Sequence, residues 1–439
     1  MKKYFYPILA ITFSAFSLGA QTQHPRTCGV LTHEAYLQQQ QPERAAERAA
    51  YEQNMTARLG NANENSVQSA VTIPVVVHVV YSTTAQNIST NQILSQIAVL
   101  NQDFTGTNSD ASNTPAAFQG AVSNPNIQFC LAKQDPSGNF TDGIERRQNT
   151  VTTSWIDDDK VKHYSQGGLD AWDPAHYFNI WVCNLGGGLL GYAEFPSSNV
   201  SQTFGVVIGY YYFGSNYTSY GTFSLDPEYN RGRTTTHEVG HCFNLYHIWG
   251  DDTNADGTCN DGAGQCSGSD VVADTPNQCD CHYGAFAVGS VQTDACTSSS
   301  PGTMWMNYMD YTDDVSMYMF TTGQVARMTN VINAAPYNAL TTSNKCQLAG
   351  VENLSPGITI DLFPNPSTGK FNLEIALASQ SQLQITVTNA LGEIVYSLAQ
   401  ENSNGGAFAI DLSQEANGVY FVEVRAANAL KAERVLLNQ

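Results

Sequence analysis

One eleven-residue stretch constrains the fold more than any other part of the chain. It reads H-E-x-x-H-x-x-N-x-x-H and runs from His237 through Glu238, His241 and Asn244 to His247. On a helix, residues four apart leave the same face about one turn from each other, so His237 and His241 can bind one tetrahedral Zn²⁺. A third ligand at His247 requires the helix to end near Asn244 and the chain to turn sharply there. Asn suits such a turn, because it is the commonest non-Gly residue in the left-handed conformation.

Glu238 directly follows the first predicted zinc ligand. Its carboxylate can reach a metal-bound water rather than the metal, which is the position of a general base in a hydrolytic zinc site. The competing interpretation is an ordinary capped helix, since Thr235-x-x-Glu238 is also a capping-box pattern. That interpretation leaves the three histidines unexplained.

The composition predicts an exported protein with more than one domain. The 439 residues exceed one average domain. Residues 1–20 combine Met-Lys-Lys with an apolar run and small residues, as in a signal peptide cleaved near Ala20. No later stretch is apolar and long enough to span a bilayer. A net charge of -20 argues against nucleic acid or an anionic membrane surface as partner.

Ten cysteines in an exported chain predict disulfide bonds, although spacing alone does not define the pairs. Cys28 stands apart, because it lies in the polar residues 21–69, which are typical of a pro-region with a helical patch around residues 34–59. A thiolate is a good zinc ligand, so Cys28 can occupy the open coordination position of the metal and keep a zymogen inactive. The alternative is a disulfide, for example with Cys346.

Residues 70–337 are expected to form an α/β lobe that carries the zinc helix, followed by a lower lobe with little regular structure. His78, inside the first strand, is expected to be a satisfied core histidine. A Gly-rich loop at 186–191 should lead into an edge strand at 192–193. The other strands are expected at residues 73–81, 126–132, 177–183 and 205–213, and a helix at residues 91–104.

The acidic stretch at residues 251–276 offers oxygen ligands for structural Ca²⁺. In its first part, Asp252, Asn254 and Asp256 stand at alternate positions, as do the first ligands of a Ca²⁺-binding loop. The twelfth position of that loop is Ala263, so it is not an EF-hand. The alternative is a solvated, turn-rich loop. The candidate ligands are Asp252, Asn254, Asp256, Asp270, Asp274 and Thr275.

Met309 lies between aromatic residues, 62 residues after His247. Alone, such a Met is more often part of a core. Together with the zinc motif, the segment resembles the Met-turn of the metzincin zinc peptidases, which carry Gly where this chain has Asn244. The resemblance implies that Met309 lies beneath the metal and that Tyr311 hydrogen-bonds the reacting centre.

Further landmarks narrow the resemblance to the pappalysin family, which includes ulilysin-like enzymes and cytophagalysin. It covers roughly residues 70–335, with Cys28-Gly29 matching a pro-region motif. It implies endopeptidase activity, catalytic Zn²⁺, structural Ca²⁺ and a metzincin-type fold, in which a mixed sheet and the zinc helix lie over a loop-rich lower lobe. The landmarks lie at residues 73–81, 187–193, 272–276 and 320–328.

The same resemblance implies a specificity residue. Asp314 stands five residues after Met309, where ulilysin-like members have an Asp that selects basic P1′ side chains. Arg and Lys would pair with such a carboxylate by charge-assisted hydrogen bonds. The family tends to have a Cys two residues later, where this chain has Ser316, which puts one family disulfide in doubt. If Cys28 is a switch, an odd number of cysteines remains, and Cys242 is expected to be unpaired.

Residues 338–356 are polar and turn-prone, as in a linker. Residues 357–439 show short alternating strands between Gly, Asn and Ser turns, which predicts a small all-β sandwich. Its motifs resemble the C-terminal sorting domains of type IX secretion, which implies the export machinery as a partner. The alternative is a sandwich that binds carbohydrate or protein.

The sequence therefore predicts a secreted zinc endopeptidase that cleaves proteins or peptides before Arg or Lys and is made as a latent zymogen. Zinc would be held by His237, His241 and His247, with Glu238 as the base. Two alternatives remain open at this stage: a non-catalytic surface adhesin with structural zinc, and a zinc hydrolase of a non-peptide amide.

Overall fold

The computed structural model describes residues 26–61, 70–250, 266, 268–347, 358–389, 394–426 and 429–438. The predicted signal peptide lies outside these ranges. One large hydrophobic core draws its residues from positions 28 to 340, and a separate core lies within residues 358–437. None of the helices in the described ranges is both long and apolar enough to cross a membrane.

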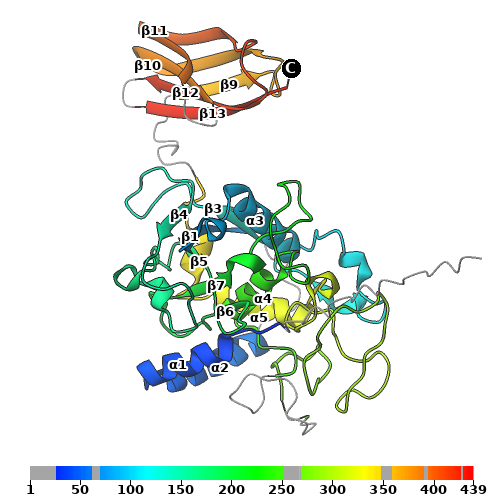
Figure 1. Cartoon of the computed structure of the whole chain (residues 1–439). Helices are drawn as coiled ribbons and strands as arrows, with labels where there is room; N and C mark the ends of the chain where they lie inside the picture. The colour runs from blue at the N-terminus through cyan, green and yellow to red at the C-terminus, as the bar shows by residue number, and fades with distance from the viewer. Residues whose placement is uncertain are drawn as a thin grey trace, which may run out of the picture.

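A mixed six-stranded sheet forms the centre of the first unit (Figure 1). Its order is β3-β1-β5-β7-β6, with β4 also paired to β1. All pairs are parallel except that of β6 with β7, which places an antiparallel strand at the edge. This architecture confirms the predicted α/β class. The strands are β1 (Val71–Tyr81), β3 (Ile127–Leu131), β4 (Ile144–Gln148), β5 (Phe178–Cys183), β6 (Gly191–Ala193) and β7 (Gly205–Gly209).

The central strand β1 is buried on both faces, as its dense β-branched sequence predicts. His78 within it is satisfied by Glu145 and Asn179, at 2.8 and 2.9 Å, and so is a core histidine. The helices α3 (Thr90–Thr105) and α4 (Arg233–Cys242) pack on the sheet, α4 against β6 and β7. The edge strand β6 therefore lies directly over the helix that carries the zinc motif.

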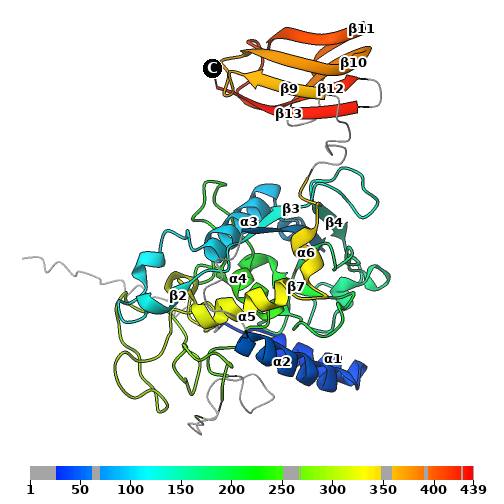
Figure 2. The same cartoon turned by 180° about the vertical axis from the view of Figure 1, so that it is seen from behind.

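Residues 30–61 form two helices rather than one helical patch. They are α1 (Val30–Gln40) and α2 (Arg44–Asn61), which lie side by side along the first unit in both views (Figure 1, Figure 2). The break falls at Gln41, whose φ is -132°. The following Pro42 explains it, because a residue before proline is disfavoured in the helical conformation.

After α4 the chain builds a lobe in which residues 268–319 carry little regular structure, as predicted. Trp305 and several methionines form its small core. The expected strand at 205–213 is too long, because β7 ends at Gly209 and Tyr210–Tyr212 form a 3-10 helix. The remaining elements of the unit are β2 (Val122–Ser123), β8 (Phe320–Thr321), α5 (Thr322–Ile332), α6 (Asn338–Thr342) and 3-10 helices at Thr84–Gln86, Ala111–Asn113, Gln119–Ala121, Lys160–Lys162, Tyr164–Gln166 and Asp314–Ser316.

The C-terminal unit is an all-β sandwich made from one sheet that folds over nearly like a barrel. Its order is β11-β10-β12-β13, and β9 pairs with the first half of β10 while β12 pairs with the second half. The bulges along β10 allow the sheet to bend between these two partners. The strands are β9 (Ile358–Phe363), β10 (Lys370–Asn389), β11 (Ile394–Asp411), β12 (Gly418–Ala426) and β13 (Ala429–Leu437).

Disulfides join segments that are distant in sequence. Cys130 of β3 is bonded to Cys346, and Cys266 to Cys296. Cys281 is disulfide-bonded as well. The alternative bond between Cys28 and Cys346 is therefore wrong, and the bond at Cys346 ties part of the expected linker to β3. Cys242 is a free thiol as predicted, but within the described residues Cys183 and Cys279 are free too.

We expect the bond between Cys130 and Cys346 to stabilise the first unit, because it closes a loop of 216 residues. Replacing both residues by Ser should lower the free energy of unfolding by about 2–4 kcal/mol. Calorimetry of the full chain measures this as a lower melting temperature. Cys279→Ser is the matched control and should melt like the wild type. Equal melting of all three proteins would contradict the prediction.

Candidate active site

The local structure of the motif follows its sequence. Helix α4 starts after Gly232, whose φ is 81°, so Thr235 lies inside the helix and the capping-box alternative is wrong. The helix ends at Cys242, and Asn244 has a φ of 67°. The predicted left-handed turn at Asn244 is confirmed. It reverses the chain and brings His247 back beneath the helix.

The three motif histidines are buried and converge on one point. Their Nε2 atoms lie 3.1, 3.1 and 3.2 Å from one another. The Nδ1 atoms of His237 and His241 donate to the carbonyl oxygens of Tyr308 and Leu245, each at 2.7 Å. Since a carbonyl can only accept, the Nε2 atoms of these two rings carry lone pairs. Lone pairs directed at a common centre repel unless a cation lies between them, so the donor set fits Zn²⁺.

Glu238 lies beside this centre, under the edge strand. Its Oε2 is 3.3 Å from the Sγ of Cys28. A Cβ placed on Gly191 of β6 would come within 2.9 Å of the Glu238 side chain, so only Gly allows the strand this close. Burial raises the pKa of Glu238 to about 8, and the Cys28 thiol and the Arg26 charge oppose that rise. The Glu238 carboxylate is thus placed next to the point on which the three histidines converge, within reach of a water held there.

Met309 packs directly beneath α4. A Cβ on Gly240 would come within 2.6 Å of the Met309 sulfur, which explains the Gly inside the zinc motif. The Tyr311 ring lies 4.9 Å from the ring of His247 and 5.7 Å from that of His237. The structure therefore brings both residues of the predicted Met-turn to the three histidines.

Trp249 is a site residue that the motif analysis missed. Its ring stacks on that of His247 at 4.4 Å and also contacts Tyr311 at 4.8 Å. This stacking fixes the plane of the third histidine. The only signal in the sequence was an aromatic residue two positions after His247, which is too common to predict a role.

A buried network behind the site holds His237. Tyr308 accepts the Nδ1 proton of His237 on its backbone oxygen, and its hydroxyl lies 3.1 Å from Asp103 of α3. Arg233 forms an ion pair with Asp103 at 3.2 Å. Burial raises the pKa of Asp103 to about 6, an effect that Arg233 opposes. The network links α3, α4 and the Met-turn into one rigid support.

Asp314 lies near the start of α4, and its two oxygens have different partners. Oδ2 accepts the backbone N–H groups of Arg231 and Arg233, at 2.8 and 3.2 Å. Oδ1 accepts a guanidinium N–H of Arg26 at 2.6 Å, and both side chains are 1% exposed. The backbone contacts fix the carboxylate so that its other oxygen faces a basic side chain.

Cys28 belongs to the same cluster. Its sulfur and the three histidine nitrogens all lie within 4.8 Å of one another. Cys28 pairs in parallel with Gly191 of β6, and its neighbours add hydrogen bonds from Gly29 N–H to Gly191 and from Leu190 N–H to Thr27. The segment 26–29 thus lies along the edge strand, with its arginine at Asp314 and its cysteine at the histidines.

Only three of the six predicted calcium ligands, Asp270, Asp274 and Thr275, lie within the described residues. Asp252, Asn254 and Asp256 lie outside the described residues. Asp270 accepts a hydrogen bond from the Thr275 hydroxyl at 2.8 Å. Asp274 instead accepts bonds from the Thr321 hydroxyl and the Gly323 N–H at the start of α5. Among the described residues, Asp270 therefore stabilises its own loop, and Asp274 connects that loop to the start of α5.

Two family models match the chain. The first, described as pregnancy-associated plasma protein-A, matches residues 161–333, and the second, a secretion system C-terminal sorting domain, matches residues 361–438. The first range contains the zinc motif and the Met-turn. The second covers most of the C-terminal sandwich.

Curated relatives and solved structures agree with these models. Extracellular metalloproteases of Arthroderma benhamiae and Sordaria macrospora are both 30% identical to the chain, over 64% and 76% of it and 85% and 97% of their own lengths. A mutant of promirolysin from Tannerella forsythia is 42% identical with a TM-score of 0.63, over 72% of this chain and 97% of that one. Mature mirolysin in complex with a cleaved peptide is 47% identical with a TM-score of 0.57, over 62% and 96%.

The position of Glu238 predicts that its loss stops turnover and leaves the metal bound. Glu238→Ala should reduce peptide hydrolysis by at least about 10²–10⁴-fold, the usual contribution of a general base. Metal analysis should still find one zinc per chain, because the three histidines remain. The His241→Ala variant should lose both zinc and activity. Wild-type rates in Glu238→Ala would contradict the assignment.

Proposed function

The chain belongs to the pappalysin family of metzincin zinc peptidases, and on that premise we propose that it is made as a latent zymogen and cleaves before Arg or Lys. It is a secreted zinc metalloendopeptidase with a C-terminal sorting domain. The proposal rests above all on one observation. Arg26 forms an ion pair with Asp314, and in the same segment Cys28 lies next to the three histidines.

We propose that His237, His241 and His247 hold the zinc. When bound, the metal acidifies a water molecule and polarises the carbonyl of the scissile bond. Glu238 accepts the proton of the attacking water and returns it to the leaving amine. The Tyr311 hydroxyl donates a hydrogen bond to the oxygen on which negative charge develops. Met309 supports the histidines from below.

The contact between Arg26 and Asp314 supports selection of a basic P1′ side chain. In a substrate, an Arg or Lys would take the place of Arg26, with Oδ1 of Asp314 as acceptor. Because the backbone of Arg231 and Arg233 already binds Oδ2, the pocket needs little rearrangement to receive a guanidinium.

Chain direction supports latency. A substrate places P1′ after the scissile bond, whereas the pro-segment places Arg26 before Cys28. The segment 26–29 therefore runs opposite to a substrate, which is consistent with its parallel pairing to β6. It fills the cleft without presenting a bond in the orientation for cleavage. The pro form of mirolysin also covers a larger share of this chain than the mature form does.

Two further assignments are part of the proposal. The residues 357–439 would be read by the export machinery, as the sorting-domain match suggests. The acidic residues 251–276 would bind structural Ca²⁺, for which the spacing of their oxygen ligands is the support. The adhesin and the hydrolase of non-peptide amides are set aside, because the curated relatives named above are extracellular metalloproteases.

Specificity can be tested with Asp314→Asn. Mass spectrometry of a peptide library, digested by protein from residue 21 onward before and after limited trypsin, maps the cuts, with a chelator control. Wild type should cut before Arg and Lys, whereas Asp314→Asn should lose about 10²-fold or more of that preference, because a buried charge pair is broken. Asp313→Asn is the matched control. Equal cutting before Arg and Ala by the wild type would exclude this role of Asp314.

Latency can be tested with Cys28→Ala. Uncleaved wild type should be nearly inactive, and the variant should show activity before any trypsin is added, because no thiolate then competes for the metal. A fluorogenic peptide with Arg at P1′ measures the rate. Cys183→Ala, which also removes a buried thiol, should stay latent. If uncleaved Cys28→Ala protein were as inactive as uncleaved wild type, the role of Cys28 in latency would be refuted.

A further inference from the structure

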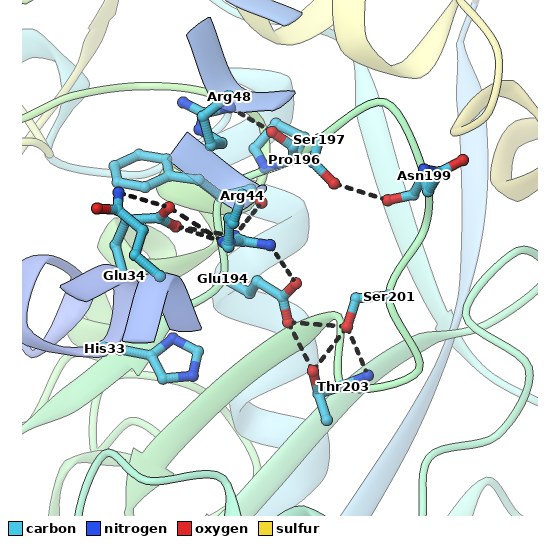
Figure 3. A network of polar contacts seen from close by, with 12 residues as sticks. His33, Glu34, Arg44, Arg48, Glu194, Pro196, Ser197, Asn199, Ser201 and Thr203 are labelled. Carbon is cyan, nitrogen blue, oxygen red and sulfur yellow. Dashed lines mark hydrogen bonds and ion pairs between the residues drawn. The ribbon is translucent and has the colours of Figure 1, made fainter. Parts of the chain in front are cut away.

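The pro-region also contacts the catalytic unit at a second surface, away from Cys28. Arg44, at the start of α2, is 2% exposed and lies between two carboxylates (Figure 3). One belongs to Glu34 of α1, at 2.8 Å, and the other to Glu194, which follows β6, at 3.2 Å. The guanidinium also donates to the backbone oxygen of Phe195 at 3.2 Å. Glu194 is 1% exposed, so this ion pair is fully covered.

The Glu194 carboxylate is held in place from the other side. Its Oε2 accepts hydrogen bonds from the hydroxyls of Ser201 and Thr203, at 3.3 and 2.9 Å (Figure 3). Its Oε1 is thus presented towards Arg44. The catalytic unit therefore holds the Glu194 carboxylate in an orientation that binds one guanidinium group.

One turn further along α2, Arg48 reaches the turn of the zinc motif. Its guanidinium donates to the side-chain oxygen of Asn244 at 3.1 Å, to the Tyr246 hydroxyl at 3.0 Å and to the backbone of Pro196. The side-chain amide of Asn244 in turn donates to Glu52 at 2.9 Å. Arg48 and Glu52, four residues apart on α2, thus bind the oxygen and the nitrogen of the Asn244 side-chain amide.

Glu52 also neutralises a cation of the catalytic unit. It accepts a hydrogen bond from Arg327 of α5 at 2.5 Å. Arg327 is 1% exposed and donates as well to the backbone oxygen of Asn244 at 3.1 Å. Two arginines and a glutamate of α2 thus face Glu194, Asn244 and Arg327, and the first and last of these contacts pair opposite charges.

Apolar contacts complete the surface. Tyr51 and Met55 of α2 are buried and join the large core of the catalytic unit. His33 of α1 lies between Asp159, at 2.9 Å, and the ring of Tyr192, at 4.7 Å. The helices are therefore packed as an integral layer and do not merely lie on the surface.

From these contacts we infer that α1 and α2 bind the catalytic unit independently of their covalent connection, so that residues 26–61 remain bound as an inhibitor after a cut in residues 62–69. The inference rests on the proposed zymogen function. All the contacts described lie before residue 62, so such a cut breaks none of them. Separation would instead break the ion pairs of Arg44 with Glu194 and of Glu52 with Arg327, and would expose the buried side chains of Tyr51 and Met55 to water. Activation then requires a second cut within the helices.

The first test is made on the full chain from residue 21, with the recognition sequence of a site-specific protease inserted between residues 62 and 69. In the Glu238→Ala background, which prevents self-digestion, the cut protein is examined by size-exclusion chromatography and mass spectrometry. We expect the pro-fragment to elute with the catalytic unit. In the wild-type background we expect the cut protein to retain less than about a tenth of the activity that appears after limited trypsin, because a covered multi-contact interface dissociates slowly.

Variants of the pro-region, together with one variant of the catalytic unit, identify the contacts that hold the cut fragment. Arg44→Ala and Glu52→Gln should each raise the dissociation constant of the cut fragment by about tenfold or more, since each leaves a buried partner charge unpaired. Glu43→Gln, at an exposed position of the same region, is the matched control and should have no effect. Glu194→Gln combined with Arg44→Gln should cost less than the sum of the two changes, because they remove the same contact.

The outcomes separate this inference from the proposed function. Elution of the fragment apart from the catalytic unit, together with full activity after the single cut, would overturn the inference. Retention of the fragment with no peptidase activity even after trypsin would leave the inference in place and refute the proposed specificity and latency.

Discussion

The close approach of three imidazole nitrogens, 3.1–3.2 Å apart in a buried site, is the constraint on which the rest of the structure depends. Such an arrangement is stable only around a cation, and only if each ring is held in orientation. Backbone carbonyls of Tyr308 and Leu245 orient two of the rings, and Trp249 stacks on the third. The sheet, α3 and the Met-turn supply the rigid surroundings that these contacts require.

The elements predicted correctly are those set by local spacing. Two histidines four residues apart define α4, and the residue type at Asn244 identifies the turn, because both depend on backbone geometry within a few residues. The β-branched run of β1 likewise predicts a strand covered on both faces. By contrast, the strand expected at 205–213 extends beyond the observed β7, because three consecutive tyrosines fit a strand pattern yet form a 3-10 helix.

Contacts between distant segments could not be predicted from local patterns. The pairing of Arg26 with Asp314 joins residues 288 positions apart, and the bond between Cys130 and Cys346 spans 216. The position of Asp314 was identified by resemblance alone, and nothing in its surroundings in the sequence indicates a partner. The contact of Arg44 with Glu194 also joins distant segments, and local patterns do not predict it, because a charged residue on a polar helix such as Arg44 usually faces solvent.

Asn244 links the chemistry of the site to its control. The backbone of this residue needs a left-handed conformation so that His247 can reach the other histidines, and Gly meets that need equally well. The side chain that Asn adds is bound on both ends by α2, through Arg48 and Glu52. Since Arg327 also holds the Asn244 backbone oxygen, the turn is fixed to the body on one side and to the pro-region on the other. The pro-region therefore contacts the same turn on which the geometry of the metal ligands depends.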